Sequence, residues 1–260
     1  PDAVCVGENI TMSAAQSASP DAPIIGYRWG FGDGTTANAE TVTKRYVTPG
    51  RYNVSVLVDD GMNRASSQRE TSKIILVNQP PNAIAGRDRM VCPGVPVQFD
   101  ATASSDPDGR ISKYEWDFGD GKFKTGAQPE HTFDRPGTYN VTLRVTDDSG
   151  SSCSFRDDQM TVVVNAPPTA DAGLDREVFV GGANDAEMFS AWRSFDPDGT
   201  DLAHVWDFGP DGQRSGERVS HTFSAPGDYD VRLTVSDGTG LSCGTASDTI
   251  LVRARAREVY

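Results

Sequence analysis

The sequence predicts an all-β protein built as a tandem array of three β-sandwich domains. A tryptophan-centred motif occurs three times, and its tryptophans lie 87 and 90 residues apart. A Pro-Gly pair followed two residues later by a tyrosine recurs at the same two intervals. Self-similarity at a fixed period indicates that one structural unit is repeated. The residues that anchor the repeat, and that we expect to have structural roles in each core, are Trp29, Trp116, Trp206, Tyr52, Tyr139 and Tyr229.

Each repeat carries the period-two pattern of a β-strand with one buried face. After the second Pro-Gly pair, apolar residues alternate with polar ones from Tyr139 to Val145. Clusters of Asp, Pro and Gly, which favour turns, separate this strand from others. In the second repeat we expect those strands at Val95–Phe99, Ile111–Phe118 and Met160–Val164. About seven short strands per repeat are typical of a two-sheet sandwich that encloses a tryptophan.

Two proline-rich linkers mark the expected domain boundaries. Pro80-Pro81 and Pro167-Pro168 begin two closely similar segments. Consecutive prolines favour an extended and stiff backbone. We therefore expect domains at residues 1–79, 80–166 and 167–260. Strands of ordinary length would make such an elongated array on the order of 100 Å long.

The composition excludes several classes of function. The 260 residues have a formal net charge of -13, so the overall field does not favour binding to nucleic acid or to an anionic membrane. No apolar run approaches the roughly 18 residues of a membrane-spanning helix, and we expect no membrane insertion. The chain starts at Pro1 and stops at Tyr260 within the repeat pattern, so we expect a segment of a longer protein.

The histidines argue against an enzyme. His131 and His221 occupy the same position in two repeats, and a catalytic histidine is seldom copied into a structural repeat. The sequence has no His-Glu-x-x-His motif and no phosphate-binding glycine loop. We therefore expect both histidines to be packing residues, and we expect no catalytic residue and no catalytic activity in this segment.

The repeats resemble the PKD domain, an immunoglobulin-like module common in surface proteins of bacteria and archaea. The resemblance rests on Trp-Asp-Phe-Gly-Asp-Gly at 116–121 and on Ser-x-Asp-Pro-Asp-Gly at 104–109 and 194–199. It implies three tandem immunoglobulin-like (PKD) β-sandwiches from a prokaryotic surface or secreted protein. The first repeat departs most from the pattern, because it has Gly30 in place of the motif Asp and lacks the full acidic loop.

The resemblance also implies Ca²⁺ as a ligand. Certain PKD-like domains of secreted collagenases bind calcium with an acidic loop and a linker asparagine, and Ca²⁺ takes about six to eight oxygen ligands. The structural alternative is that Asp-Pro-Asp-Gly is simply a good turn. We expect acidic side chains to meet at one end of each sandwich, and the resemblance adds the two linker asparagines. The candidate ligands are Asn78, Asp106, Asp108, Asp147, Asp148, Asn165, Asp196, Asp198 and Asp237.

Four cysteines without a Cys-x-x-Cys motif indicate disulfides and an oxidising compartment. Cys5 and Cys92 each precede their tryptophan by 24 residues, whereas Cys153 and Cys243 each follow theirs by 37. In successive immunoglobulin-like sandwiches, the early and late positions lie at ends that meet. Pairing Cys5 with Cys153 and Cys92 with Cys243 therefore uses all four thiols. The alternative pairs Cys92 with Cys153 and leaves Cys5 and Cys243 for neighbouring domains.

These features predict a non-enzymatic spacer and interaction segment of an extracellular, cell-surface or periplasmic protein. Its expected partners are other protein domains or copies of itself. The alternative is an adhesive module that binds polysaccharide or protein and accompanies a secreted enzyme. A polysaccharide site needs exposed aromatic rings, and we expect Trp192, the one tryptophan outside the motif, to pack at a loop base. The segment Arg253–Arg257 places three arginines on one strand face, toward water or a following domain.

Overall fold

The computed structural model describes residues 2–65, 67–182 and 185–257. In these ranges the chain forms β-strands and a single 3-10 turn, η1 (Gly209–Asp211), so the predicted all-β class is confirmed. No helix in the described ranges is long and apolar enough to cross a membrane. The chain divides into two compact units, which consist of Pro1–Arg87, Gln98–Pro129 and Asn140–Met160, and of Asp88–Val97, Glu130–Tyr139 and Thr161–Tyr260.

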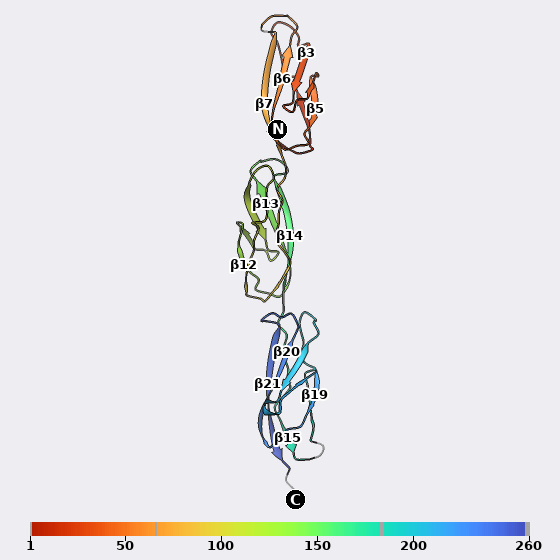
Figure 1. The fold of residues 1–260 in the computed structure, drawn as a ribbon, viewed down its shortest axis with the longest axis vertical. Helices are drawn as coiled ribbons and strands as arrows, with labels where there is room; N and C mark the ends of the chain where they lie inside the picture. The colour runs from red at the N-terminus through yellow and green to blue at the C-terminus, as the bar shows by residue number, and fades with distance from the viewer. Residues whose placement is uncertain (1, 66, 183–184, 258–260) are drawn as a thin grey trace. The chain divides into compact units, whose positions relative to one another are not determined.

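Repeat 1 forms a five-stranded and a two-stranded sheet. Its strands are β1 (Ala3–Cys5), β2 (Asn9–Ser13), β3 (Gly26–Gly30), β4 (Thr36–Ala37), β5 (Thr41–Arg45), β6 (Gly50–Asp59) and β7 (Gln68–Asn78). The larger sheet has the order β1-β7-β6-β3-β4, and β2 pairs with β5. β6 and β7 lie side by side as a long antiparallel pair (Figure 1), whereas β1 runs parallel to β7. The parallel pair sets Cys5 opposite Asn78 at the end of β7.

Repeat 2 has the same order of strands. They are β8 (Arg89–Val91), β9 (Pro96–Gln98), β10 (Ile111–Asp117), β11 (Phe123–Thr125), β12 (Glu130–Thr132), β13 (Gly137–Asp147) and β14 (Phe155–Val164). The sheets are β11-β10-β13-β14-β8 and β12-β9. The three expected strands are present, but β14 begins five residues before Met160. Its first residues are mostly exposed and polar, so they lack the apolar alternation from which a strand is predicted.

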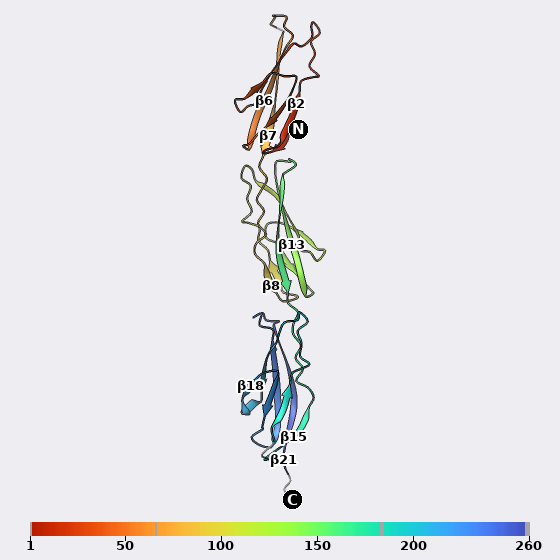
Figure 2. The ribbon, with the colours of Figure 1, turned by 90° about the vertical axis from the view of Figure 1, so that its right-hand side faces the viewer.

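Repeat 3 repeats this arrangement once more. Its strands are β15 (Arg176–Val180), β16 (Glu187–Ser190), β17 (Ala203–Asp207), β18 (Gln213–Ser215), β19 (Arg218–His221), β20 (Gly227–Ser236) and β21 (Thr245–Ala256). The sheets are β15-β21-β20-β17-β18 and β16-β19. Figure 2 shows β15 beside β21, its parallel partner. Pro210, the extra residue in the third tryptophan motif, lies in the turn η1.

The motif tryptophans are buried, as predicted, and their polar group is satisfied in the same way in every repeat. Each indole Nε1 donates a hydrogen bond to the carbonyl oxygen ten residues later, at 2.8, 3.1 and 3.2 Å. A buried indole usually needs such a partner. The donor and acceptor pairs are Trp29 with Ala39, Trp116 with Gly126, and Trp206 with Gly216.

The repeat tyrosines fasten the start of the long central strand to the loop before it. Each hydroxyl donates to the carbonyl four residues earlier, at 3.0, 2.9 and 2.8 Å. The contact resembles the tyrosine corner of immunoglobulin-like sandwiches, where a tyrosine hydroxyl bonds back to the preceding backbone. The pairs are Tyr52 with Thr48, Tyr139 with Arg135, and Tyr229 with Ala225.

The glycine that follows Phe118 in the second tryptophan motif is required by a close approach of backbone. Gly119 has a φ of 73°, and a Cβ on it would lie 2.7 Å from the carbonyl oxygen of Asn140. Gly32 makes the equivalent approach to Asn53 in repeat 1. Gly209, the third copy, has nothing within 4 Å of its Cβ position. The motif glycine is therefore fixed by packing in the first two repeats and by its positive φ in all three.

Candidate functional site

All four cysteines form disulfides, and each bond joins one repeat to the next. Cys5 is bonded to Cys153, and Cys92 is bonded to Cys243, with Cα separations of 5.9 and 5.8 Å. These are the pairs that the cysteine register favours, and the alternative pair Cys92–Cys153 is not formed. The first bond lies within one compact unit and the second within the other. We call the surroundings of Cys5–Cys153 the first junction and those of Cys92–Cys243 the second junction.

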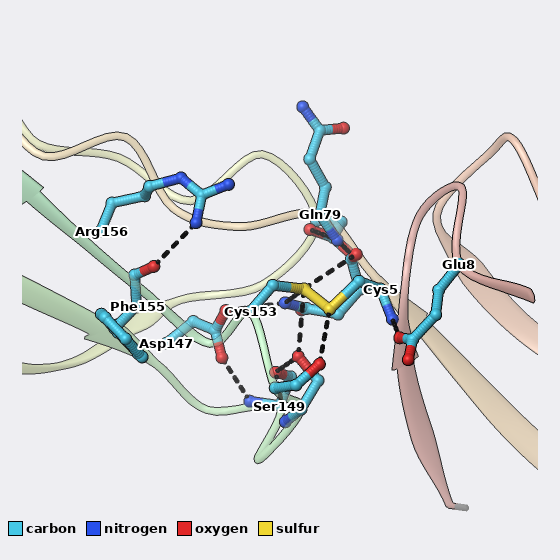
Figure 3. Close-up of a disulfide and its surroundings, with 12 residues drawn as sticks. Cys5, Glu8, Gln79, Asp147, Ser149, Cys153, Phe155 and Arg156 are labelled. Carbon is cyan, nitrogen blue, oxygen red and sulfur yellow. Dashed lines mark hydrogen bonds between the residues drawn. A yellow bond between two sulfur atoms is a disulfide. The ribbon is translucent and has the colours of Figure 1, made fainter.

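The first junction brings the end of β7 against the loop that follows β13. Asn78 donates from Nδ2 to Asp147 Oδ2 at 2.9 Å and also contacts the Cys153 sulfur at 3.7 Å. Both Asn78 and Asp147 are buried. Figure 3 shows Asp147 and Ser149 on the Cys153 side of the bond, where the Ser149 N–H donates to Asp147 Oδ1 at 2.8 Å. One asparagine therefore touches both the disulfide and a buried carboxylate.

The acidic loop of repeat 2 faces the same junction. The Gln79 backbone N–H donates to both oxygens of Asp108 at 3.2 Å. Asp106 Oδ2 is buried and has no hydrogen-bond partner. A Cβ on Gly109 would lie 2.6 Å from Asp106 Oδ2 and 3.0 Å from Asp148 Oδ1, so these two carboxylates converge over the glycine. Burial raises the pKa of Asp106, and the charges of neighbouring aspartates raise it further. Several negatively charged side chains are therefore crowded together around this loop.

The second junction repeats these contacts. Asn165 donates from Nδ2 to Asp237 Oδ2 at 2.9 Å and contacts the Cys243 sulfur at 3.8 Å. The Ala166 N–H donates to Asp198 Oδ2 at 2.7 Å. Although burial acts to raise it, hydrogen bonds from Thr239 and then Asn165 hold the pKa of Asp237 below its ordinary value. The geometry at the second junction therefore reproduces that at the first.

The second junction also contains an unsatisfied carboxylate oxygen. Asp196 is 9% exposed, and its Oδ2 has no hydrogen-bond partner. A buried carboxylate oxygen without a partner is costly, and a bound cation would remove that cost. Among the described residues, however, no three His, Cys, Asp or Glu side chains are grouped closely enough to hold a metal by themselves. A calcium ion here would also need the asparagine and other oxygens, which Ca²⁺ accepts.

The structure thus gathers the nine predicted ligands into two sets. The first set is Asn78, Asp106, Asp108, Asp147 and Asp148, and the second is Asn165, Asp196, Asp198 and Asp237. Asp148 is also paired with Arg110 at 2.9 Å. Sequence analysis missed the backbone N–H groups of Gln79 and Ala166. Their position directly after the linker asparagines is the signal that would have found them.

One sequence pattern of a hydrolase nucleophile occurs in the chain, at the second junction. Gly240-Leu241-Ser242-Cys243-Gly244 fits Gly-x-Ser-x-Gly. In hydrolases that motif forms a sharp turn between a strand and a helix. Here it lies in the connection between β20 and β21, its cysteine is disulfide-bonded, and Ser242 Oγ contacts the Cys92 sulfur at 3.5 Å. The pattern therefore belongs to the disulfide junction and does not form a nucleophile elbow.

The two repeat histidines are buried, in keeping with the packing role expected for them. The His221 ring stacks on Phe208 with a centroid distance of 3.9 Å and meets Phe223 edge-on. Burial lowers the pKa of His221, although Asp211 acts in the opposite direction. His131 packs edge-on against Phe133 in the same manner.

Two sequence expectations in repeat 3 are wrong. Trp192 does not pack at a loop base, because it is 63% exposed, and the Arg193 guanidinium lies over its ring, 5.0 Å from the centroid. The arginines near the end of β21 do not all face water. Arg255 pairs with Glu177 and Asp228, and Arg257 pairs with Asp185. These carboxylates belong to the same repeat: Glu177 lies in β15, Asp228 in β20, and Asp185 in the connection before β16.

The comparison with protein families settles the class of the domains. The sequence profile described as PKD domain matches the chain three times, at residues 1–75, 78–162 and 165–252. The chain therefore belongs to the PKD domain family. A structure of three immunoglobulin domains of titin, 15% identical, aligns over 98% of this chain and 95% of that one with a TM-score of 0.57, which supports the fold.

Two of the similar proteins of known name are a collagenase and a metalloprotease. Collagenase ColA of Clostridium perfringens is 37% identical over 115 residues, which are 44% of this chain and 10% of that protein. Pre-pro-metalloprotease PrtV of Vibrio cholerae is 33% identical over 171 residues, which are 65% of this chain and 17% of that protein. The chain thus corresponds to less than a fifth of the length of either relative.

Proposed function

We propose that this chain is a non-enzymatic structural and interaction segment of a larger extracellular protein. The observation that carries the proposal is the pair of disulfides, each of which joins a cysteine of one repeat to a cysteine of the next. A bond inside one domain would stabilise that domain alone, whereas these bonds hold successive domains together. Disulfides persist in oxidising compartments, so the segment belongs outside the cell, at its surface or in the periplasm.

The partners that we propose are other protein domains, either in the same polypeptide or in further copies of this chain. Two of the named relatives are a collagenase and a metalloprotease, and the matched region is a small part of each. By analogy with them, we infer that the segment accompanies a functional domain located elsewhere in its protein. Its own contribution is to hold that domain at a distance or against a neighbour.

Non-reducing peptide mapping of the protein from its native source tests the proposal. We expect one cross-linked peptide that contains Cys5 and Cys153, a second that contains Cys92 and Cys243, and no free thiol. A peptide that links Cys92 to Cys153, together with free Cys5 and Cys243, would overturn the proposal, because the repeats would then be joined by their linkers alone.

We also propose that Ca²⁺ binds at both junctions. The proposal is supported by the unpartnered oxygens of Asp106 and Asp196 and by the buried pairs Asn78–Asp147 and Asn165–Asp237. When bound, the cation would supply positive charge among carboxylates that otherwise repel one another. The residues of this chain would orient it through the same loops that carry the late cysteines.

Calcium is therefore expected to stabilise the oxidised protein against heat. At a calcium concentration 100 times the dissociation constant, binding adds about 2.7 kcal/mol, which corresponds to a rise in melting temperature of roughly 5–10 °C. Scanning calorimetry with calcium and with a chelator measures this. Asp106→Asn with Asp196→Asn should abolish the rise, whereas Asp33→Asn in repeat 1 should leave it intact. Equal melting temperatures for the wild type in both buffers would exclude calcium at these sites.

A second candidate function, binding of a neutral polysaccharide, is favoured by a hollow in repeat 3. Trp192 and Phe195 are 63% and 55% exposed and line this hollow with Asp201 and Glu217. Aromatic faces suit the apolar face of a sugar ring, and carboxylates accept hydrogen bonds from hydroxyl groups. The equivalent positions in repeat 2 are threonine and serine. The large apolar side chains are therefore peculiar to repeat 3.

Retention on insoluble polysaccharide tests this second candidate. Trp192→Ala is expected to lose at least ten-fold in retention on cellulose or chitin, because it removes the stacking surface. Phe123→Ala is the matched control, since Phe123 is 70% exposed but lies in repeat 2. Equal retention of the wild type and Trp192→Ala, or no retention of either, would rule the polysaccharide site out.

A further inference from the structure

We propose that each disulfide sets the cation affinity of the acidic loop beside it, so that thiol oxidation and cation binding are linked at each junction. The inference rests on the proposed calcium sites but goes beyond them. It gives the cysteines a positioning role in addition to a structural one. The closed loop and the asparagine contacts occur at both junctions, with different residues at each.

The late cysteine and a buried aspartate of repeat 2 belong to one closed loop. In repeat 2 the Asp147 N–H donates to the Ser154 carbonyl at 2.7 Å, so the connection between β13 and β14 is pinned at its base. Cys153 lies just inside this base. The disulfide therefore attaches the whole loop, and with it the Asp147 carboxylate, to the end of β1.

Polar contacts join the Asp147 carboxylate to the Cys153 sulfur inside that loop. Asp147 Oδ1 accepts from the Ser149 N–H at 2.8 Å, and Ser149 Oγ donates to Ser151 Oγ at 3.1 Å. Ser151 Oγ in turn lies 3.4 Å from the Cys153 sulfur. A shift of the Cys153 sulfur therefore displaces the Asp147 carboxylate through short, mostly buried contacts (Figure 3).

Asn78 provides an independent connection between the carboxylate and the disulfide. Its Nδ2 lies 2.9 Å from Asp147 Oδ2 and 3.7 Å from the Cys153 sulfur, and the same sulfur lies 3.8 Å from the Asn78 carbonyl oxygen. Asn78 is also the register partner of Cys5. The asparagine is thus held from both sides of the disulfide. If the bond opens, it loses one of its two anchors.

The second junction shares the closed loop and the asparagine contacts of the first. The Asp237 N–H donates to the Gly244 carbonyl at 3.0 Å and closes a loop that contains Cys243. Asn165 connects Asp237 to the Cys243 sulfur at 2.9 and 3.8 Å. The Cys243 N–H also donates to the Cys92 sulfur at 3.2 Å. The coupling therefore does not depend on a peculiarity of one loop.

The consequence for binding follows from the cost of ordering a loop. With the disulfide formed, the aspartate is already held in place, and cation binding loses little conformational entropy in ordering it. With two thiols, the loop must be ordered when the cation binds, and the affinity falls. Loss of a group that orients metal ligands typically costs about 10–100-fold in affinity. Because such coupling is reciprocal, bound calcium must shift the thiol–disulfide equilibrium toward the disulfide by the same factor.

The redox step itself is ordinary thiol–disulfide exchange. One thiolate of a dithiol such as dithiothreitol attacks one sulfur of the bond, and the other cysteine leaves as a thiolate that takes up a proton. The second thiolate of the reductant then resolves the mixed disulfide. The cysteines gain two electrons and two protons, and the reductant becomes a cyclic disulfide.

Calcium titration of the full chain by calorimetry tests the affinity. We expect two sites in the oxidised wild type. The Cys5→Ser with Cys153→Ser variant should weaken one site about ten-fold and spare the other. The Cys92→Ser with Cys243→Ser variant should weaken the other site. If the oxidised wild type takes up no calcium, the proposed calcium sites fail. If it binds calcium and the serine variants bind it equally well, the coupling is wrong.

A measurement on the wild type alone avoids any effect of the serine variants on folding. The chain is equilibrated in dithiothreitol redox buffers with calcium or chelator, then alkylated and mapped by mass spectrometry. Calcium should favour each disulfide about ten-fold. In Asn78→Ala, that shift should vanish for Cys5–Cys153 and persist for Cys92–Cys243, and Asn165→Ala should show the reverse. Unchanged equilibria in the wild type, under calcium that saturates the sites, would overturn the proposal.

Discussion

Replacing Cys92 and Cys243 together by serine is expected to lower the free energy of unfolding by about 2–4 kcal/mol. The bond joins residues 151 positions apart, so its loss frees a long stretch of the unfolded chain. Serine is close in size to cysteine, and little packing is lost. Guanidinium unfolding of the oxidised protein, followed by circular dichroism, measures the change.

Two comparisons make this result specific. The Cys5→Ser with Cys153→Ser variant should be destabilised by a similar amount, since its bond spans 148 positions. Dithiothreitol should destabilise the wild type at least as much as either variant but leave a four-serine variant unaffected. Unfolding midpoints that do not change between wild type and variants would show that these bonds contribute nothing to stability.

The second large effect is expected at the core tryptophan of repeat 3. Trp206→Ala should cost about 3–5 kcal/mol, because a fully buried aromatic ring is replaced by a cavity. The Trp206 ring packs 5.7 Å from Phe189, centroid to centroid, and its Nε1 donates to Gly216. The substitution removes both contacts. Scanning calorimetry and denaturant unfolding measure the loss, which should be confined to the transition of repeat 3.

Trp192→Ala provides the matched control, because it deletes the same side chain from an exposed position in the same repeat. Exposed substitutions usually change stability by less than about 0.5 kcal/mol. A loss as large for Trp192→Ala as for Trp206→Ala would contradict the assignment of the two tryptophans. The pair therefore tests burial within one domain and with one chemical change.

The repeats made the fold and the disulfide pairs accessible to sequence analysis. Three copies of one pattern align the repeats with one another. The alignment places Cys5 and Cys92 at one repeat position and Cys153 and Cys243 at another, and it needs no distance in space. The buried face of β13 was predicted for a similar reason, because its apolar residues alternate strictly. In both cases a pattern that recurs along the sequence leaves few structures that are consistent with it.

The details of the junctions escape such patterns. The hydrogen bonds of Gln79 and Ala166 come from backbone N–H groups, which every residue except proline has. Trp192 could not be placed because burial depends on packing across the fold, and its sequence neighbours carry no period. The early start of β14 is fixed by pairing within the sheet, although its first residues are exposed. Tertiary context decides each of these features.

The two disulfides have a mechanical consequence because they overlap along the sequence. Cys92 lies between Cys5 and Cys153, and Cys153 lies between Cys92 and Cys243. If the chain is pulled from its ends until every strand has unravelled, three stretches of backbone connect the two disulfides in parallel. They contain 87, 61 and 90 residue steps, and the shortest takes the tension.

The region from Cys5 to Cys243 would then stop lengthening at about 200–220 Å, the reach of 61 extended residues. Without cross-links, its 238 steps would reach roughly 790–860 Å. The outer two stretches stay slack even when the middle one is taut. The same four sulfur atoms that hold the repeats together therefore make the segment a tether with a built-in limit of extension.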